Sequence, residues 1–311
     1  MKGCWLLVLI GAQAAFPQGR QVQRDLEGIW SNATITPLER PADLGGKATF
    51  TPEEAAAYEK QVVARGNVDN RPKNAEADVA SAYNQFWYDR GTKAVGTRRT
   101  SLIVDPPDGR IPALTAEAQK RVQETRAWME AHATDGPEGR SLGERCIVWF
   151  TAGPPMLPGP YNNNFQIVQT RDQVVILNEM IHDARVIPLD GRPHVAENIR
   201  QWRGDSRGHW EGSTLVVDTT NFSDEYSFRG SDRNLHLTER FTRSSPDTLL
   251  YQFTVEDPTA FTKPWTAQIP VTRAKGPIYE YACHEGNYAM VDILAGARKA
   301  EQKAAGNKPP K

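Results

Sequence analysis

Residues 235–256 read LHLTERFTRSSPDTLLYQFTVE, and this stretch decides the fold. It holds two runs rich in Thr, aromatic and aliphatic residues, one on each side of Ser245-Pro246-Asp247. β-Branched and aromatic residues favour strands, and a cluster of Ser, Pro and Asp is a turn signal. Because so short a connection joins antiparallel neighbours, the stretch predicts two paired strands.

Runs of the same composition continue on both sides of this pair. We predict strands at 165–169, 173–179, 184–188, 214–220, 235–243, 248–256, 265–272 and 278–283. Turn residues such as Asp190-Gly191 and Glu211-Gly212 separate them, without a helical pattern in between. A long meander closes into a barrel or folds into two packed sheets, because open edges promote aggregation. The expected fold class is therefore mainly β: an antiparallel meander that forms a lipocalin-like barrel or cupped sheet, with peripheral helices.

The segment before the meander, residues 16–144, reads as an N-terminal extension with two helices. Thr51 and Glu54 form a capping box, and Pro52 suits the first helical position. We expect helices at 51–65 and 117–133, a surface loop at 67–84, and short strands at 26–30 and 100–104 that join the sheet. The β domain is expected at 145–288, followed by a helix at 289–303 and a disordered tail that together make up 289–311.

The first residues predict export. Met1-Lys2 precedes an apolar run at 4–10 and then small residues up to Ala15, which is the pattern of a secretory signal peptide at 1–15. A buried N-terminal strand is the alternative. The run is too short to span a bilayer, and no later segment is apolar enough to cross one. We therefore expect a periplasmic or secreted protein with no integral membrane segment in the mature chain.

Removal of the signal peptide, with Cys4, leaves Cys146 and Cys283. Two cysteines in an oxidising compartment are expected to pair, so we predict a disulfide between them. Two isolated buried thiols are the alternative.

Composition and motifs exclude several functions. Lys plus Arg total 37 and Asp plus Glu total 38, so no positive field exists to collect nucleic acid. The chain has no Gly-x-Ser-x-Gly elbow, phosphate-binding glycine loop, dinucleotide fingerprint, Cys-x-x-Cys pair or His-Glu-x-x-His helix. We therefore expect no nucleic-acid partner, no cofactor and no metal. The sequence does not specify the oligomeric state.

Three motifs carry a resemblance to a known family. They are WEGSTLVVDTTNF at 210–222, LHLTERF at 235–241 and DPTAFTKPWT at 257–266. They resemble a large family of uncharacterised exported bacterial proteins, abundant in acidobacteria and proteobacteria. The likeness covers about 100–296 and implies an exported protein, without naming an activity. Gly28-Ile29-Trp30 ahead of a meander is also similar to lipocalin-like barrels.

One functional hypothesis is a binding protein. Aromatic residues are concentrated in the meander, and a barrel lined by them would hold an apolar or amphipathic small molecule. The candidate ligand-binding residues are Trp210, His236, Glu239, Arg240, Trp265 and Tyr279. An ordinary hydrophobic core is the alternative interpretation of the aromatic residues. The Pro-rich loop at 153–161 suits a lid, a rim or a rigid crossing.

The second hypothesis is a metal-independent hydrolase, lyase or isomerase. His182 and Asp183 adjoin at a predicted hairpin and could act as a general acid–base pair. Arg185 or Arg240 would then hold an anionic group. The alternative is that these are ordinary solvated or structural charges. Convergence of His182, Asp183, Arg185, Arg240 and His236 on one cleft would favour the enzyme, whereas a largely apolar cavity would favour the carrier.

Overall fold

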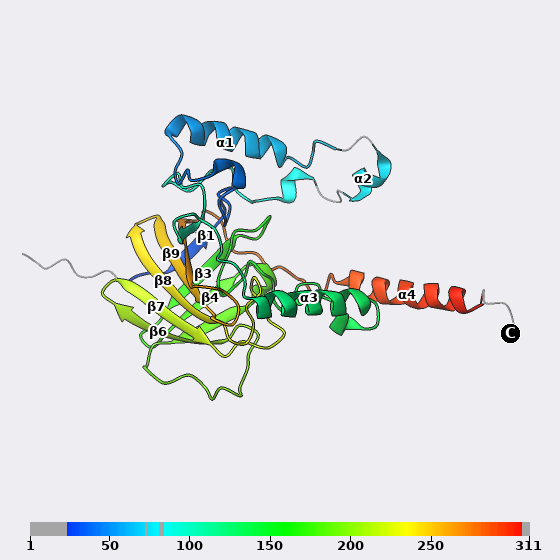
Figure 1. The fold of residues 1–311 in the computed structure, drawn as a ribbon. Coiled ribbons are helices and arrows are strands. Elements are labelled where there is room, and N and C mark those ends of the chain that lie inside the picture. Colours follow the sequence, from blue (N-terminus) through cyan, green and yellow to red (C-terminus); the bar gives the residue numbers. More distant parts are fainter. Residues whose placement is uncertain (1–23, 72–73, 81–83, 307–311) are drawn as a thin grey trace, which may run out of the picture.

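The computed structural model describes residues 24–71, 74–80 and 84–306 (Figure 1). The predicted signal peptide and the end of the predicted tail lie outside these ranges.

Within the described residues, ten strands form one antiparallel sheet. They are β1 (Gly28–Ser31), β2 (Ile103–Asp105), β3 (Asn164–Gln169), β4 (Gln173–Asn178), β5 (Ala184–Pro188), β6 (Asp205–Glu211), β7 (Thr214–Thr220), β8 (His236–Ser245), β9 (Thr248–Glu256) and β10 (Trp265–Arg273). Nine follow the order β5-β4-β3-β1-β10-β9-β8-β7-β6, and β2 pairs with β10 beside this path. The sheet curls into a nearly closed barrel (Figure 1). This confirms the predicted β meander and the predicted joining of the two short N-terminal strands.

The two end strands of the sheet, β5 and β6, approach each other without pairing. A Cβ at Gly208 of β6 would come within 2.8 Å of Ile187 Cγ2 and within 2.7 Å of Leu189 Cδ2. Glycine at this position therefore allows the two end strands of the sheet to approach each other closely.

Large apolar side chains fill the interior. Trp30, Trp265, Tyr251, Phe165, Phe222, Phe241, Phe253 and Phe261 are among the largest fully buried side chains. The rings of Phe241 and Tyr251 stack at 4.9 Å between centroids, and Phe253 meets Trp265 edge-on at 5.7 Å. Full burial of one such side chain contributes roughly 1.5–3 kcal/mol. These rings form an ordinary hydrophobic core, which was the alternative interpretation of the aromatic residues.

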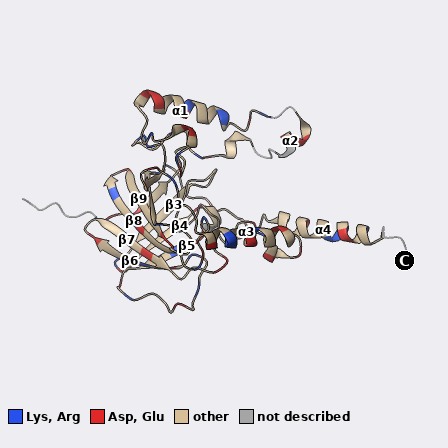
Figure 2. Ribbon diagram, viewed as in Figure 1, with Lys and Arg blue, Asp and Glu red and all other residues tan. Residues whose placement is uncertain are grey.

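The helices lie outside the barrel (Figure 1). They are α1 (Pro52–Arg65), α2 (Ala75–Ala80), α3 (Ala116–Ala131) and α4 (Tyr288–Gly306), with short 3-10 turns η1 (Ala42–Leu44), η2 (Gln85–Trp87), η3 (Pro137–Gly139) and η4 (Met180–His182). The three predicted helices are present, and α1 begins with the predicted capping box. Acidic and basic residues are interspersed along the ribbon (Figure 2). No helix in the described part of the chain combines the length and apolar character needed to cross a membrane.

Three local predictions were wrong. Residues 278–283 form no strand, and the Tyr279 N–H donates to the Glu179 side chain instead of a neighbouring strand. Part of the predicted loop at 67–84 forms α2. Strand β6 was missed because its residues, DSRGHWE, lack the β-branched composition of the other strands.

The Pro-rich loop is a buried crossing and not a lid. Residues 151–157 are all buried. The Met156 N–H donates to the Tyr251 hydroxyl at 3.0 Å, and the Tyr226 hydroxyl donates to the Pro154 carbonyl at 2.9 Å. The loop is therefore fixed to the barrel core by two buried tyrosines.

The predicted disulfide is confirmed. Cys146 and Cys283 are bonded, with their Cα atoms 5.7 Å apart. The bond joins the loop before β3 to the segment between β10 and α4.

Candidate functional site

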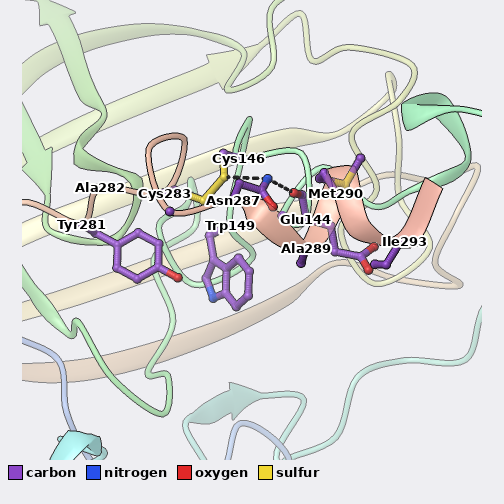
Figure 3. Close-up of a pocket in the computed structure, with 12 residues that line it drawn as sticks. Glu144, Cys146, Trp149, Tyr281, Ala282, Cys283, Asn287, Ala289, Met290 and Ile293 are labelled. Atoms are coloured by element: carbon purple, nitrogen blue, oxygen red, sulfur yellow. Dashed lines mark hydrogen bonds between the residues drawn. A yellow bond between two sulfur atoms is a disulfide. The ribbon is translucent and has the colours of Figure 1, made fainter. Parts of the chain in front are cut away.

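A cavity of about 350 Å³ lies beside the disulfide (Figure 3). Three segments line it: the loop at 143–149, the segment at 281–287 and the first turns of α4. The apolar lining includes Trp149, Met290 and Ile293, and Tyr281 adds an aromatic ring with a polar end. Its volume falls at the lower end of the range typical of small-molecule sites.

Glu144 lies in the first of the three segments that line the cavity. Its carboxylate accepts hydrogen bonds from the Ser141 N–H at 3.0 Å and hydroxyl at 2.9 Å, and it forms an ion pair with Arg140. Burial alone would raise the pKa of Glu144, but the Ser141 hydrogen bonds and Arg140 lower it overall. The carboxylate therefore holds its own loop together at the edge of the cavity.

Asn287 joins the two covalently linked segments. Its side-chain amide donates to the Glu144 carbonyl at 2.7 Å and contacts Cys146 Sγ at 3.4 Å (Figure 3). These contacts fix the start of α4 next to the disulfide. Further along α4, the Arg298 guanidinium donates to the Thr134 carbonyl at 2.6 Å.

The cavity combines apolar walls with a few polar groups. The indole N–H of Trp149 is buried and has no hydrogen-bond acceptor among the described residues. Met290 and Ile293 come from the first two turns of α4. Such a lining suits an apolar body with one or two polar atoms.

A second group of residues lies inside the barrel. The Arg185 guanidinium donates to both carboxylate oxygens of Glu239, at 2.5 and 3.1 Å, and the Tyr251 hydroxyl donates to Glu239 at 2.7 Å. Burial by itself would lower the pKa of Arg185, yet Glu239 raises it overall. Burial and then Glu239 raise the pKa of Tyr251 well above its usual value. The cluster is a closed, internally satisfied ion pair.

The predicted acid–base pair directly precedes β5, the strand that carries Arg185. Asp183 forms an ion pair with the buried Arg203, with 2.6 Å between Oδ2 and Nε. His182 ends the 3-10 turn η4, and its side chain lies outside the described part of the structure. The preceding Ile181 has a φ of 62°, which is strained for a β-branched residue.

A row of alternating carboxylates and imidazoles crosses strands β6 to β9. Ring nitrogens of His194 lie 2.9 Å from Asp205 and 2.8 Å from Asp218, and those of His236 lie 2.5 Å from Asp218 and 3.1 Å from Glu256. The hydrogen bond to Asp218 raises the pKa of His236, with burial opposing it and Glu256 adding to it. The hydrogen bond from His236, with a further one from His194, lowers the pKa of Asp218 against the effect of burial. His194 thereby ties the loop before β6 to the sheet.

The structure does not bring the predicted ligand-binding residues into one cavity. Glu239 and Trp265 are fully buried in the core, whereas His236 and Arg240 face outward on β8, where Arg240 pairs with Glu211. The remaining two lie elsewhere: the Arg24 guanidinium covers the Trp210 ring at 5.7 Å, and Tyr279 is 67% exposed after β10.

Sequence reasoning missed Trp149, Asn287, Arg203 and His194. The two cysteines were the available signal for the cavity, since Trp149 and Asn287 lie within four residues of them. No pattern marked Arg203 or His194, because their partners are 11 to 24 residues away in the sequence and meet them only in the folded chain.

Comparisons of the chain with protein-family models, curated protein sequences and solved structures gave no match. The resemblance to exported bacterial proteins therefore stays an expectation. In the described part of the chain, no three His, Cys, Asp or Glu residues are grouped so that they could hold a metal ion.

Proposed function

We propose that the protein is an exported binding protein or carrier for a small apolar or amphipathic molecule, held in the cavity beside the disulfide. The observation that carries the proposal is the 350 Å³ cavity with Trp149, Tyr281, Met290 and Ile293 in its lining. Aromatic side chains offer large apolar area at a low cost in conformational entropy. The buried indole N–H of Trp149, which has no hydrogen-bond acceptor among the described residues, suits a ligand with a polar end.

The proposed location is the periplasm or the extracellular medium. It rests on the signal-peptide pattern and on the Cys146–Cys283 bond. Disulfides persist in oxidising compartments. The bond lines the cavity itself, so a carrier of this design needs such a compartment to keep its site assembled.

The first experiment identifies the ligand by mass spectrometry of small molecules that co-purify with the mature, disulfide-bonded protein. The second measures binding of the fluorescent apolar probe Nile red. Trp149→Ala is expected to weaken binding roughly tenfold or more, because it removes the largest aromatic wall. Trp128→Ala is the matched control, since Trp128 is a 49% exposed tryptophan on α3 outside the cavity lining.

The proposal fails if Trp149→Ala and Trp128→Ala bind the probe as tightly as the wild type and no small molecule co-purifies. A second cavity variant, Ile293→Asp, checks the other wall, because a carboxylate in the lining opposes binding of an apolar ligand.

The enzyme alternative has weaker support. Of its two candidate anion clamps, Arg185 donates to both oxygens of Glu239 and Arg240 pairs with Glu211. Asp183 already pairs with Arg203. Since His236 and Arg240 face outward while Arg185 is buried in the barrel, the five residues that would favour an enzyme do not converge on one cleft.

A further inference from the structure

Three arginines are almost completely buried in the described part of the chain: Arg40, Arg185 and Arg203, with exposures of 5%, 7% and 8%. Two of them have protein acceptors for their guanidinium groups. Arg40 donates to the Thr100 hydroxyl at 3.0 Å and the Pro107 carbonyl at 3.1 Å. Arg185 donates to both oxygens of Glu239.

Arg203 differs from both. Its Nη1 and Nη2 atoms are buried and have no hydrogen-bond acceptor among the described residues. The Nε atom of Arg203 forms an ion pair with Asp183 Oδ2, but its N–H is not aligned for a hydrogen bond. Buried polar groups in proteins are nearly always hydrogen-bonded, so an unpaired buried guanidinium is a strong sign of a missing acceptor.

We propose that Arg203 is the anchor of a second binding site, separate from the disulfide cavity, that takes a small carboxylate monoanion through Nη1 and Nη2. The two Nη groups form a planar fork that matches the two oxygens of a carboxylate. Asp183 marks the solvent side of the site, because its side chain is 41% exposed whereas that of Arg203 is 9% exposed.

Electrostatics around Arg203 favour such a ligand. Burial lowers the pKa of Arg203, Asp183 opposes this effect in part, and the neighbouring charge of Arg185 lowers it further. A bound anion at the Nη groups would compensate both the desolvation and the repulsion between the two guanidinium groups.

The charges also select the ligand. Glu239 neutralises Arg185, and Asp183 neutralises Arg203, so the four groups sum to zero. A monoanion adds one negative charge next to Asp183, whereas a phosphate dianion adds two and is repelled more strongly. The site therefore suits a carboxylate better than a phosphate.

The test uses the full mature chain with its disulfide intact. Sodium acetate is titrated against sodium chloride at constant ionic strength, and binding is followed by calorimetry and by the thermal unfolding midpoint. We expect saturable acetate binding, weaker binding of inorganic phosphate, and none of acetamide, the neutral analogue. Arg203→Lys is expected to weaken acetate binding about tenfold or more, because lysine keeps the charge and loses the fork. Arg203→Met is expected to abolish it.

Two further variants separate a binding role from a structural one. Asp183→Asn is expected to strengthen acetate binding roughly fivefold, because it removes the neighbouring negative charge. Arg233→Met is the control, since Arg233 is a half-exposed arginine that pairs with Asp224 on the surface. It should bind acetate like the wild type.

The proposal is overturned if the wild type shows no saturable acetate binding, or if it binds acetamide equally well. It is also overturned if Arg203→Lys or Arg203→Met binds acetate like the wild type. Should Arg203→Met fail to fold, the comparison of acetate with acetamide on the wild type and the direction of the Asp183→Asn change still decide the outcome.

Discussion

The ion pair inside the barrel allows a sharp prediction about stability. Glu239 on β8 is fully buried and accepts hydrogen bonds from Arg185 on β5 and from Tyr251 on β9. Glu239→Gln keeps the shape of the side chain and removes the negative charge. It leaves the Arg185 charge buried without its counter-ion, and breaking a buried pair in this way costs about 3–5 kcal/mol.

A double variant separates the effect of the buried charges on stability from the effect of side-chain packing. Arg185→Met with Glu239→Leu removes both charges and fills the space with apolar side chains. Replacing a buried ion pair in this way is often neutral or stabilising. The Tyr251 hydroxyl loses its acceptor in this variant, which costs about 1–3 kcal/mol. We therefore expect the double variant to be more stable than Glu239→Gln.

The assay is urea unfolding of the disulfide-bonded protein, with linear extrapolation of the free energy of unfolding to water. Two results would refute the reasoning. A loss of less than about 1 kcal/mol in Glu239→Gln would mean that Arg185 is not desolvated. A double variant no more stable than Glu239→Gln would mean that the loss comes from packing around Tyr251.

Three other outcomes are expected. The folded-state pKa of His236 is raised, so its contribution to stability is complete below about pH 6.5 and is lost as the pH rises through the folded pKa. An NMR titration should show the raised pKa, and Asp218→Asn should reduce the upward shift. Reduction of the disulfide, whose cysteines are 137 residues apart, should lower the free energy of unfolding by roughly 5 kcal/mol in the chain-entropy model. Thiol titration of the unfolded, unreduced protein should find no free thiol. Gly204→Ala should lower the thermal midpoint more than Gly212→Ala, because both glycines have positive φ but only the Gly204 Cβ would lie 2.5 Å from a carbonyl oxygen, that of Thr220.

The sequence predicted strands best where side chains alternate between core and surface. Strands β7 and β9 have their predicted bounds, and β9 alternates between buried and half-buried positions along its whole length. Strand β6 was not predicted, because polar and charged residues take the place of β-branched ones along it and two of them form charge pairs. Asp205 bonds His194, and Glu211 pairs with Arg240.

The disulfide was predictable because the expected export and the cysteine count predict it without any knowledge of the fold. The cavity was not, because its walls come from three segments that the disulfide brings together. Strand alternation places Glu239 on the opposite face of β8 from His236 and Arg240. Its partner Arg185 could not be predicted, because that contact depends on the curvature of the whole sheet.

The filled barrel explains why a ligand would bind outside it. The Arg185–Glu239 pair must stay dry and fully hydrogen-bonded to be tolerated in the interior. The Tyr251 hydroxyl, which donates to Glu239, also accepts the Met156 N–H of the buried loop. An apolar ligand entering this space would have to displace that loop and leave buried polar groups unpaired. A cavity between the disulfide and α4 avoids this conflict. Helix α4 has no buried residue, so a ligand can pack against it without displacing core side chains.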